Sequence, residues 1–229
     1  MNAHMNADTH DYLAAGDFID SDHAGIQAFA RDRAGEGDDR QRAVRLYYAV
    51  RDDIRYDPYT FSLDPDKLRA SATLAAGGGY CVPKAGLLAA CARAASIPAR
   101  IGLADVKNHL ASERLLALMQ TDIFYYHGYT ELWLDGRWVK ATPAFNIELC
   151  ERFGVKPLDF DGRADALMHE FDTAGRRHMQ YLVDHGPRAD LPLAELTAVY
   201  RKRYPRLLGA LEELSGDMGA EMEQERMHS

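Results

Sequence analysis

One short stretch constrains this chain more than any other, the segment GGGYCVPKAGLLAACARAASIPAR at residues 77–100. Its three glycines permit backbone conformations that other residues avoid, and the alanine- and leucine-rich run after Cys81 is typical of a helix. Pro83 suits a first helical turn and Pro98 cannot continue a helix, so we predict a helix over residues 82–96. Cys81 therefore lies where a glycine loop meets the start of a helix.

That position favours reactivity. The amino terminus of a helix carries partial positive charge and unpaired N–H groups, which stabilise a thiolate and lower the pKa of a thiol below its usual value of about 8.5. The same N–H groups are suited to bind an oxyanion developing on a substrate carbonyl. The alternative is that Cys81 is a small buried apolar residue, as free cysteines commonly are. That alternative applies to Cys91, among alanines inside the helix, while Cys150 carries no signal.

A nucleophilic cysteine needs a base, and His127 is the candidate. It begins the segment HGYTELWLDGRWV, whose pattern predicts two strands joined at Asp135-Gly136, the strongest hairpin signal in the chain. On such a strand His127, Tyr129 and Glu131 share one face, and the residues between them share the other. The alternative is that His127 is an ordinary half-buried side chain, and it is the pairing with Cys81 that favours the catalytic interpretation.

Composition sets wider limits. The 229 residues suffice for one sizeable domain, and the formal net charge of −8 argues against a general nucleic-acid binder. The sequence has no 18-residue apolar run and no signal-peptide pattern, so we expect neither a membrane span nor secretion, but a cytoplasmic location. Three cysteines without metal-ligand spacing predict neither structural disulfides nor a zinc site.

Hydrophobic periodicity divides the rest of the chain into further elements. Apolar residues at helical spacing from Ala43 to Ile54 predict a helix that Asp38 or Asp39 caps and Pro58 ends. A strand is predicted at ARIGLADV, and a short helix over residues 108–120 that starts near Asn108 or Ser112. Beyond residue 147 the pattern is mostly helical. We therefore expect an N-terminal segment (1–39), a core (40–146) and a helical C-terminal extension packed on the core (147–229).

These segments resemble the transglutaminase-like superfamily of papain-like cysteine enzymes. In that family a G-x-C loop opens a helix ending in GIPAR, and a strand of the form HAWVEV precedes a hairpin and the motif W-V-x-x-D-P. This chain has GGYCVPKAGLLAACARAASIPARIG, then HGYTELWLDGRWVKATPAFN, with YYAVRDDIRYDP upstream. The resemblance implies an α+β fold with a papain-like transglutaminase core, in which the nucleophile helix packs on an antiparallel β-sheet. The small size of the chain is similar to that of the bacterial hydrolase-like members of the family.

By this resemblance Cys81 matches the nucleophile and His127 the general base, but the third residue of the catalytic triad departs from the pattern. The family's aspartate falls on Thr142, which can orient an imidazole only through a neutral hydrogen bond. Asn146 is a second candidate, since an asparagine fills this role in papain-like proteases, and an acid from elsewhere in the chain is a third.

The implied activity is acyl transfer through a thioester on Cys81, with hydrolysis preferred over transfer to an amine, a peptide or protein amide as substrate, and no cofactor. Gly79, Tyr80 and Tyr126 are the expected substrate-binding residues. The competing interpretation is a catalytically weak domain that binds a peptide or a partner protein. The missing aspartate supports this interpretation. A redox-sensing thiol is a third interpretation, without an evident resolving cysteine. The oligomeric state stays open.

A cluster of histidines near residue 180 raises the question of a metal. His169, Asp172, His178 and His185 occur within one short segment. Their spacing matches no helical H-x-x-x-H pair and no known ligand set, so we predict no metal site.

Overall fold

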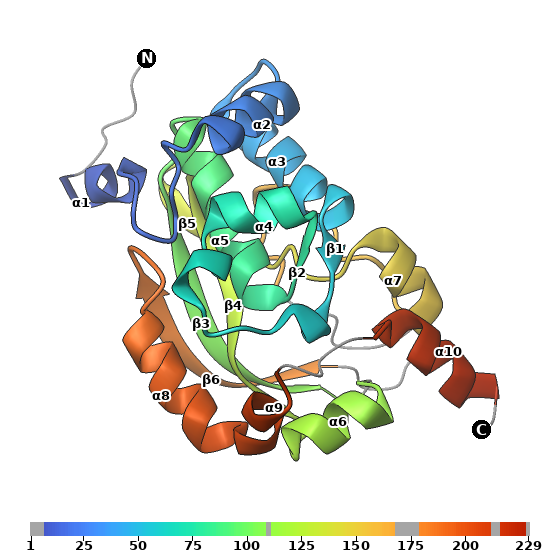
Figure 1. The fold of residues 1–229 in the computed structure, drawn as a ribbon. Helices are drawn as coiled ribbons and strands as arrows, with labels where there is room; N and C mark the ends of the chain where they lie inside the picture. Colours follow the sequence, from blue (N-terminus) through green and yellow to red (C-terminus); the bar gives the residue numbers. More distant parts are fainter. Residues whose placement is uncertain (1–6, 109–110, 168–178, 212–215, 228–229) are drawn as a thin grey trace.

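In a computed structural model, which describes residues 7–108, 111–167, 179–211 and 216–227, the chain forms an α+β fold around one antiparallel sheet (Figure 1). The sheet has the strand order β5-β4-β3-β6, and a short parallel pair, β1 with β2, lies apart from it. The strands are β1 (Arg55–Tyr56), β2 (Gly78–Gly79), β3 (Ala99–Asn108), β4 (Ile123–Leu134), β5 (Arg137–Ala141) and β6 (Met179–Arg188).

The helices are short, apart from those that pack in the centre of the molecule. In chain order they are α1 (Ala7–His10), α2 (Ala24–Ala34), α3 (Asp39–Asp53), α4 (Ala70–Ala76), α5 (Cys81–Ala94), α6 (Glu113–Met119), α7 (Ile147–Phe153), α8 (Leu193–Arg203), α9 (Pro205–Gly209) and α10 (Met218–Met227), with 3-10 turns η1 (Asp11–Leu13), η2 (Pro58–Thr60) and η3 (Pro65–Lys67).

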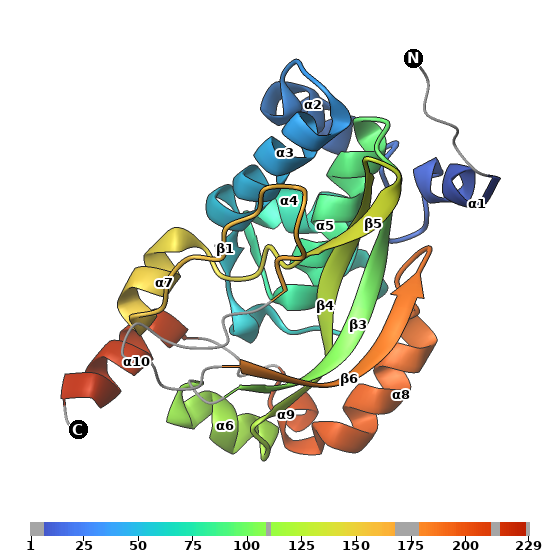
Figure 2. The same cartoon turned by 180° about the vertical axis from the view of Figure 1, so that it is seen from behind.

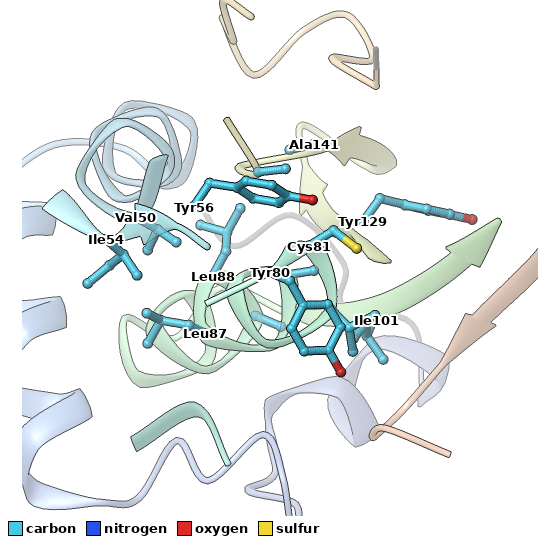
Figure 3. Packing of buried hydrophobic residues seen from close by; sticks show 14 of the residues in the cluster. Val50, Ile54, Tyr56, Tyr80, Cys81, Leu87, Leu88, Ile101, Tyr129 and Ala141 are labelled. Carbon is cyan, nitrogen blue, oxygen red and sulfur yellow. The ribbon is translucent and has the colours of Figure 1, made fainter. Parts of the chain in front are cut away.

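Helix α5 is the centre of the fold, and the predicted packing of this helix on an antiparallel sheet is confirmed. It packs on β4 and β3 with one side and on α2, α3 and α4 with the others, so almost every one of its residues is buried (Figures 1 and 3). Its many alanines explain this position, because small side chains let neighbouring elements approach from all sides.

The β4–β5 hairpin also follows the prediction. Asp135 and Gly136 both have positive φ (50° and 83°), the backbone of a type I′ turn that matches the twist of paired strands. Asp38 caps α3 in a reciprocal capping box with Gln41, and Ser112 caps α6. Asn108, the other residue expected near that helix start, is instead the last residue of β3.

Three elements differ from the sequence-based expectation. Helix α2 forms within the N-terminal segment and α4 just before the glycine loop, where no helix was predicted, and β6 forms inside an extension expected to be helical. Strand β6 pairs antiparallel with β3 across two register shifts, at the edge of the sheet (Figure 2). It forms because β3 offers an open edge, which no local pattern reveals. The division of the chain at residues 39 and 146 stays a prediction.

A buried lysine joins α5 to the end of α3. Lys84 is completely buried and its ammonium group donates hydrogen bonds to the carbonyl oxygens of Arg51 (3.0 Å) and Ile54. These carbonyls belong to the C-terminal end of α3, where the helix leaves acceptors without partners. Lys84 thereby fixes the start of β1, which lies beside the glycine loop, relative to the first turn of α5.

Candidate active site

Cys81 is the first residue of α5. The preceding Gly78 and Gly79 form β2, and the Gly79 carbonyl accepts a hydrogen bond from the Asp57 N–H (3.0 Å). Tyr80 caps the helix in an extended conformation. The glycine loop is therefore held as a strand, and it places Cys81 at the positive end of α5.

Strand β4 meets the start of α5 at Gly128. A Cβ atom added at Gly128 would lie only 2.7 Å from the Cα of Val82, so no other residue fits there unless the backbone moves. Thr130 faces the same helix, because its hydroxyl donates a hydrogen bond to the Ala85 carbonyl (2.8 Å). Since side chains alternate along a strand, His127 lies on the opposite face of the sheet, as the sequence predicts.

The thiol of Cys81 is protonated in this structure. Burial raises its pKa to about 11, because only 6% of the residue is exposed. The backbone N–H groups of Gly128, Val82 and Cys81 lie near the sulfur and lower its pKa, but the effect of burial is larger. The sequence led us to expect a lowered pKa. That expectation was wrong for this resting state, because the sequence does not reveal what covers the sulfur.

His127 is neutral. It lies on β4 opposite Ala104 of β3 and is buried, and burial lowers its pKa to about 4. Its Nδ1 atom is buried without a hydrogen-bond partner. His127 lines a small cavity, which we call the His127 cavity, whose other walls are Thr142, Ala144, Phe145, Leu158, Leu167 and Met179.

Cys81 and His127 are not joined as a catalytic pair in this conformation. Across the part of the chain that the structure describes, no hydrogen bond links the sulfur to the imidazole, and the two side chains line different cavities. The backbone nevertheless connects the two residues, because Gly128 directly follows His127 and its N–H lies near the Cys81 sulfur. A rearrangement of the His127 side chain is required before the two groups can exchange a proton.

The two candidates for the third catalytic residue occupy different places. Thr142 lines the His127 cavity, and its Oγ1 is buried without a hydrogen-bond partner. Asn146 lies at the start of α7, where its Oδ1 accepts a hydrogen bond from the Tyr56 N–H (3.1 Å). Among the described residues no acidic side chain lines the His127 cavity. Thr142 is therefore the better placed of the two to orient the imidazole.

A second cavity opens beside Cys81, and we call it the Cys81 cavity. In Figure 3 the sulfur lies between the rings of Tyr56 and Tyr80. The full set of lining residues is Tyr56, Pro58, Phe61, Tyr80, Cys81, Leu115, Met119, Phe124, Tyr200, Tyr204 and Leu207. Access to the thiol from this side therefore runs through an aromatic and aliphatic enclosure.

The residues expected to bind substrate are divided between several surroundings. Tyr80 lines the Cys81 cavity and also a larger open cavity of about 360 Å³ on its other side, which Gly79 lines as well. Tyr126 lines neither. Its hydroxyl donates a hydrogen bond to Glu195 (2.6 Å) and its ring stacks on His185.

The Cys81 cavity is also lined by Tyr56, Tyr200 and Tyr204, which were not among the residues predicted for the site. A signal exists for the last two in the segment YRKRYPR, where a spacing of four places two tyrosines on one side of a helix. Nothing local indicates that this side covers Cys81, because that contact depends on how α8 and α9 return to the sheet.

The histidine cluster is only partly described. His169, Asp172 and His178 lie outside the described residues, whereas His185 lies on β6 with its Nε2 2.9 Å from Asp105 Oδ1. Within the described ranges no group of three or more histidine, cysteine, aspartate or glutamate side chains is arranged to hold a metal ion.

Comparison with known proteins places this architecture in a class. The family model of the transglutaminase-like superfamily matches residues 27–143, a little over half of the chain. The chain therefore belongs to the transglutaminase-like superfamily, which confirms the resemblance of its cysteine and histidine segments. No curated protein matches the chain.

One similar solved structure is a Cytophaga hutchinsonii protein described as a "putative cysteine protease". It is 17% identical, with a TM-score of 0.47, and the alignment covers 80% of this chain and 55% of that one. This chain thus spans little more than half the length of that protein.

Every helix in the described ranges is too short or too polar to cross a membrane.

Proposed function

We propose that this protein is a cysteine enzyme that cleaves an amide bond through a thioester on Cys81, with water as the acyl acceptor. The observation that carries the proposal is the position of Cys81 at the first residue of α5, with the backbone N–H groups of Gly128 and Val82 near its sulfur. N–H groups in this arrangement favour a thiolate and are suited to hold a developing oxyanion. Membership of the transglutaminase-like superfamily supports the same chemistry.

In the proposed reaction His127 removes the proton of the Cys81 thiol, and the thiolate attacks the substrate carbonyl carbon. The tetrahedral intermediate collapses as the C–N bond breaks, and the imidazolium donates its proton to the leaving amine. His127 then takes a proton from water, which attacks the thioester. The acid product leaves and Cys81 regains its proton. Thr142 orients the imidazole by a neutral hydrogen bond.

The proposal requires that His127 reach the sulfur. A neutral imidazole with a pKa of about 4 and a thiol with a pKa of about 11 do not form an ion pair. In the proposed reaction, the negative charge that develops on the sulfur stabilises an adjacent imidazolium. A substrate bound next to Cys81 therefore favours the arrangement in which the His127 side chain lies beside the sulfur. The resting structure is thus an inactive arrangement of an active domain in this proposal.

The pH dependence of alkylation tests the pairing. Wild-type protein and a His127→Ala variant are treated with iodoacetamide between pH 5 and pH 10, and the modification of Cys81 is followed by peptide mass spectrometry. Iodoacetamide enters beside Cys81 as a substrate does, so a functional pair gives an apparent Cys81 pKa below the value of about 11 in the resting arrangement, and the variant loses that shift. The buried Cys91 and Cys150 in the same sample report any unfolding. An unchanged profile in the variant would count against catalysis.

A second candidate function is favoured by the same geometry. The neutral thiol, the neutral imidazole and the threonine in place of an aspartate all suit a catalytically weak domain that binds a peptide or a partner protein. The two functions differ in turnover. Release of fluorescent peptides from a labelled casein, lost in Cys81→Ser, supports hydrolysis, and incorporation of a labelled primary amine supports transfer. Absence of both, with an unchanged alkylation profile, favours the binding domain.

A further inference from the structure

The Cys81 cavity is built by parts of the chain that lie far apart in the sequence. Tyr56 comes from β1, Tyr80 from the glycine loop, and Leu115 from α6. Tyr200 of α8 and Tyr204, between α8 and α9, line the cavity from the C-terminal part of the chain. The C-terminal wall lies outside residues 27–143, the part that matches the superfamily. This wall is therefore not part of the segment that the family model matches.

Among the residues that the structure describes, no charged side chain lines the Cys81 cavity. Its polar atoms are tyrosine hydroxyls and the thiol, and burial raises the pKa of the lining tyrosines, so they are neutral at physiological pH. A charged group entering the cavity would lose its hydration without gaining an opposite charge, which is strongly unfavourable. An apolar group would gain free energy from the burial of its surface.

The hydroxyl groups add a second property. Tyr204 is committed, because its hydroxyl donates to the Ile123 carbonyl (3.2 Å) and accepts from the Tyr125 N–H (2.5 Å). The Tyr80 hydroxyl, in contrast, is buried and has no hydrogen-bond partner. A buried hydroxyl without a partner is costly, so a ligand that offers one uncharged acceptor or donor is favoured there.

We propose that the Cys81 cavity is the acyl-group pocket of this protein, and that it selects an uncharged aliphatic or aromatic acyl group and rejects one that carries a carboxylate. This inference rests on the proposed function, because the selected group is the one that becomes bonded to Cys81. The sulfur itself lines the cavity, so an acyl group held there has its carbonyl next to the nucleophile.

Two p-nitrophenyl esters of matched length test the selection, the butyrate and the hemisuccinate, which differ by a terminal carboxylate. In each acylation the Cys81 S–C bond forms, the ester C–O bond breaks, p-nitrophenolate leaves and the thiol proton passes to His127 or solvent. The rate is the growth of the Cys81 adduct, followed and located by peptide mass spectrometry, because the carboxylate of the hemisuccinate also displaces p-nitrophenolate by forming succinic anhydride. We expect the butyryl group to transfer to Cys81 at least about tenfold faster than the succinyl group, after correction for reaction of each ester with free cysteine.

Variants of the C-terminal wall sharpen the test. Leu207→Lys places a cation at the cavity wall and is expected to reduce the preference for butyryl to less than about threefold. Leu207→Ala, a milder change in case the lysine variant does not fold, is expected to raise the rate with p-nitrophenyl octanoate relative to the butyrate. Leu182→Lys is the matched control, because Leu182 is 44% exposed on β6 and does not line the cavity.

The outcomes separate the two claims. Equal butyryl and succinyl rates at Cys81 overturn the proposed selection and leave the cysteine-enzyme proposal intact. A butyryl preference that survives in Leu207→Lys and is unaltered in Leu207→Ala also overturns it, because the selection then arises elsewhere. No adduct on Cys81 with any ester overturns both proposals. A preference that collapses in Leu207→Lys but not in Leu182→Lys supports the acyl-group pocket.

Discussion

The two faces of strand β4 differ in what they do with polar groups. On the face toward α5, Gly128 lets the backbone approach the start of the helix, and its N–H reaches the Cys81 sulfur. On the other face, His127 and Thr142 enclose a cavity in which a ring nitrogen and a hydroxyl lack partners. One face places the sulfur of Cys81, the proposed nucleophile, and the other holds His127 and Thr142, the proposed base and its orienting residue, with no hydrogen bond between them.

The two candidate catalytic groups, the Cys81 thiol and the His127 imidazole, are thus positioned by different kinds of packing. Close packing of backbone against backbone places Cys81, whereas the His127 side chain lies in a cavity where its Nδ1 atom has no hydrogen-bond partner. Unpartnered buried polar atoms store free energy, which makes the His127 face the less stable half of the site. The predictions below test each face, in order of decreasing effect.

Replacement of Gly128 is expected to have the largest effect. In Gly128→Ala the new Cβ would lie 2.7 Å from the Val82 Cα, so β4 and α5 must separate, at a cost of about 1–3 kcal/mol or more. Urea unfolding measures the loss, and Cys81 alkylation should rise as the sulfur becomes exposed. Gly86→Ala is the matched control, because no atom lies within 4 Å of its added Cβ. Equal stability of the two variants would contradict the close approach.

The buried His127 predicts a pH dependence of stability. Its pKa of about 4 in the folded protein lies below the usual 6.5, so between these values the unfolded chain binds a proton that the folded chain does not. Stability should therefore fall as the pH drops from 6.5 to about 4, by roughly 3 kcal/mol in total. Urea unfolding across this range should show a steeper fall for wild type than for His127→Gln, and parallel curves would rule out a buried neutral histidine.

The family's missing acid can be restored on the His127 face. Thr142→Asp places a carboxylate in the cavity of His127 and is expected to raise the pKa of the imidazole by about 1–3. NMR titration of the His127 ring measures this directly. Thr142→Asn is the control, because it introduces an amide without a charge and should leave the pKa nearly unchanged. A similar titration in both variants would mean that position 142 does not face the ring.

The smallest effect is expected for Thr142→Val. The Oγ1 of Thr142 is buried without a partner, so replacing it by a methyl group loses no hydrogen bond and is expected to change stability by less than about 1 kcal/mol, in the stabilising direction. If Thr142 orients His127 during catalysis, the same variant reduces the rate of Cys81 acylation. Destabilisation comparable to that of Gly128→Ala would show that the hydroxyl has a partner after all.

Much of the fold could be predicted from local sequence. Pro83, the alanines after it and Pro98 define α5 by backbone preference, and Asp135-Gly136 defines the β4–β5 turn in the same way. Strand β6 could not be predicted, because it carries no clear alternation and forms by pairing with the open edge of β3. Helix α4 was missed for a similar reason, since packing against α5 stabilises a short segment next to glycines.

The candidate site likewise has features that local sequence predicts and features that depend on tertiary packing. The sequence by itself determined that a cysteine starts the central helix and that a histidine lies on the neighbouring strand with Thr142 near its hairpin, because these placements follow from residue order and strand alternation. Only the tertiary structure decided that the thiol is desolvated, that the imidazole faces another cavity, and that Tyr200 and Tyr204 cover the sulfur. Those properties depend on which distant segments pack together, and local backbone preferences carry no record of such contacts.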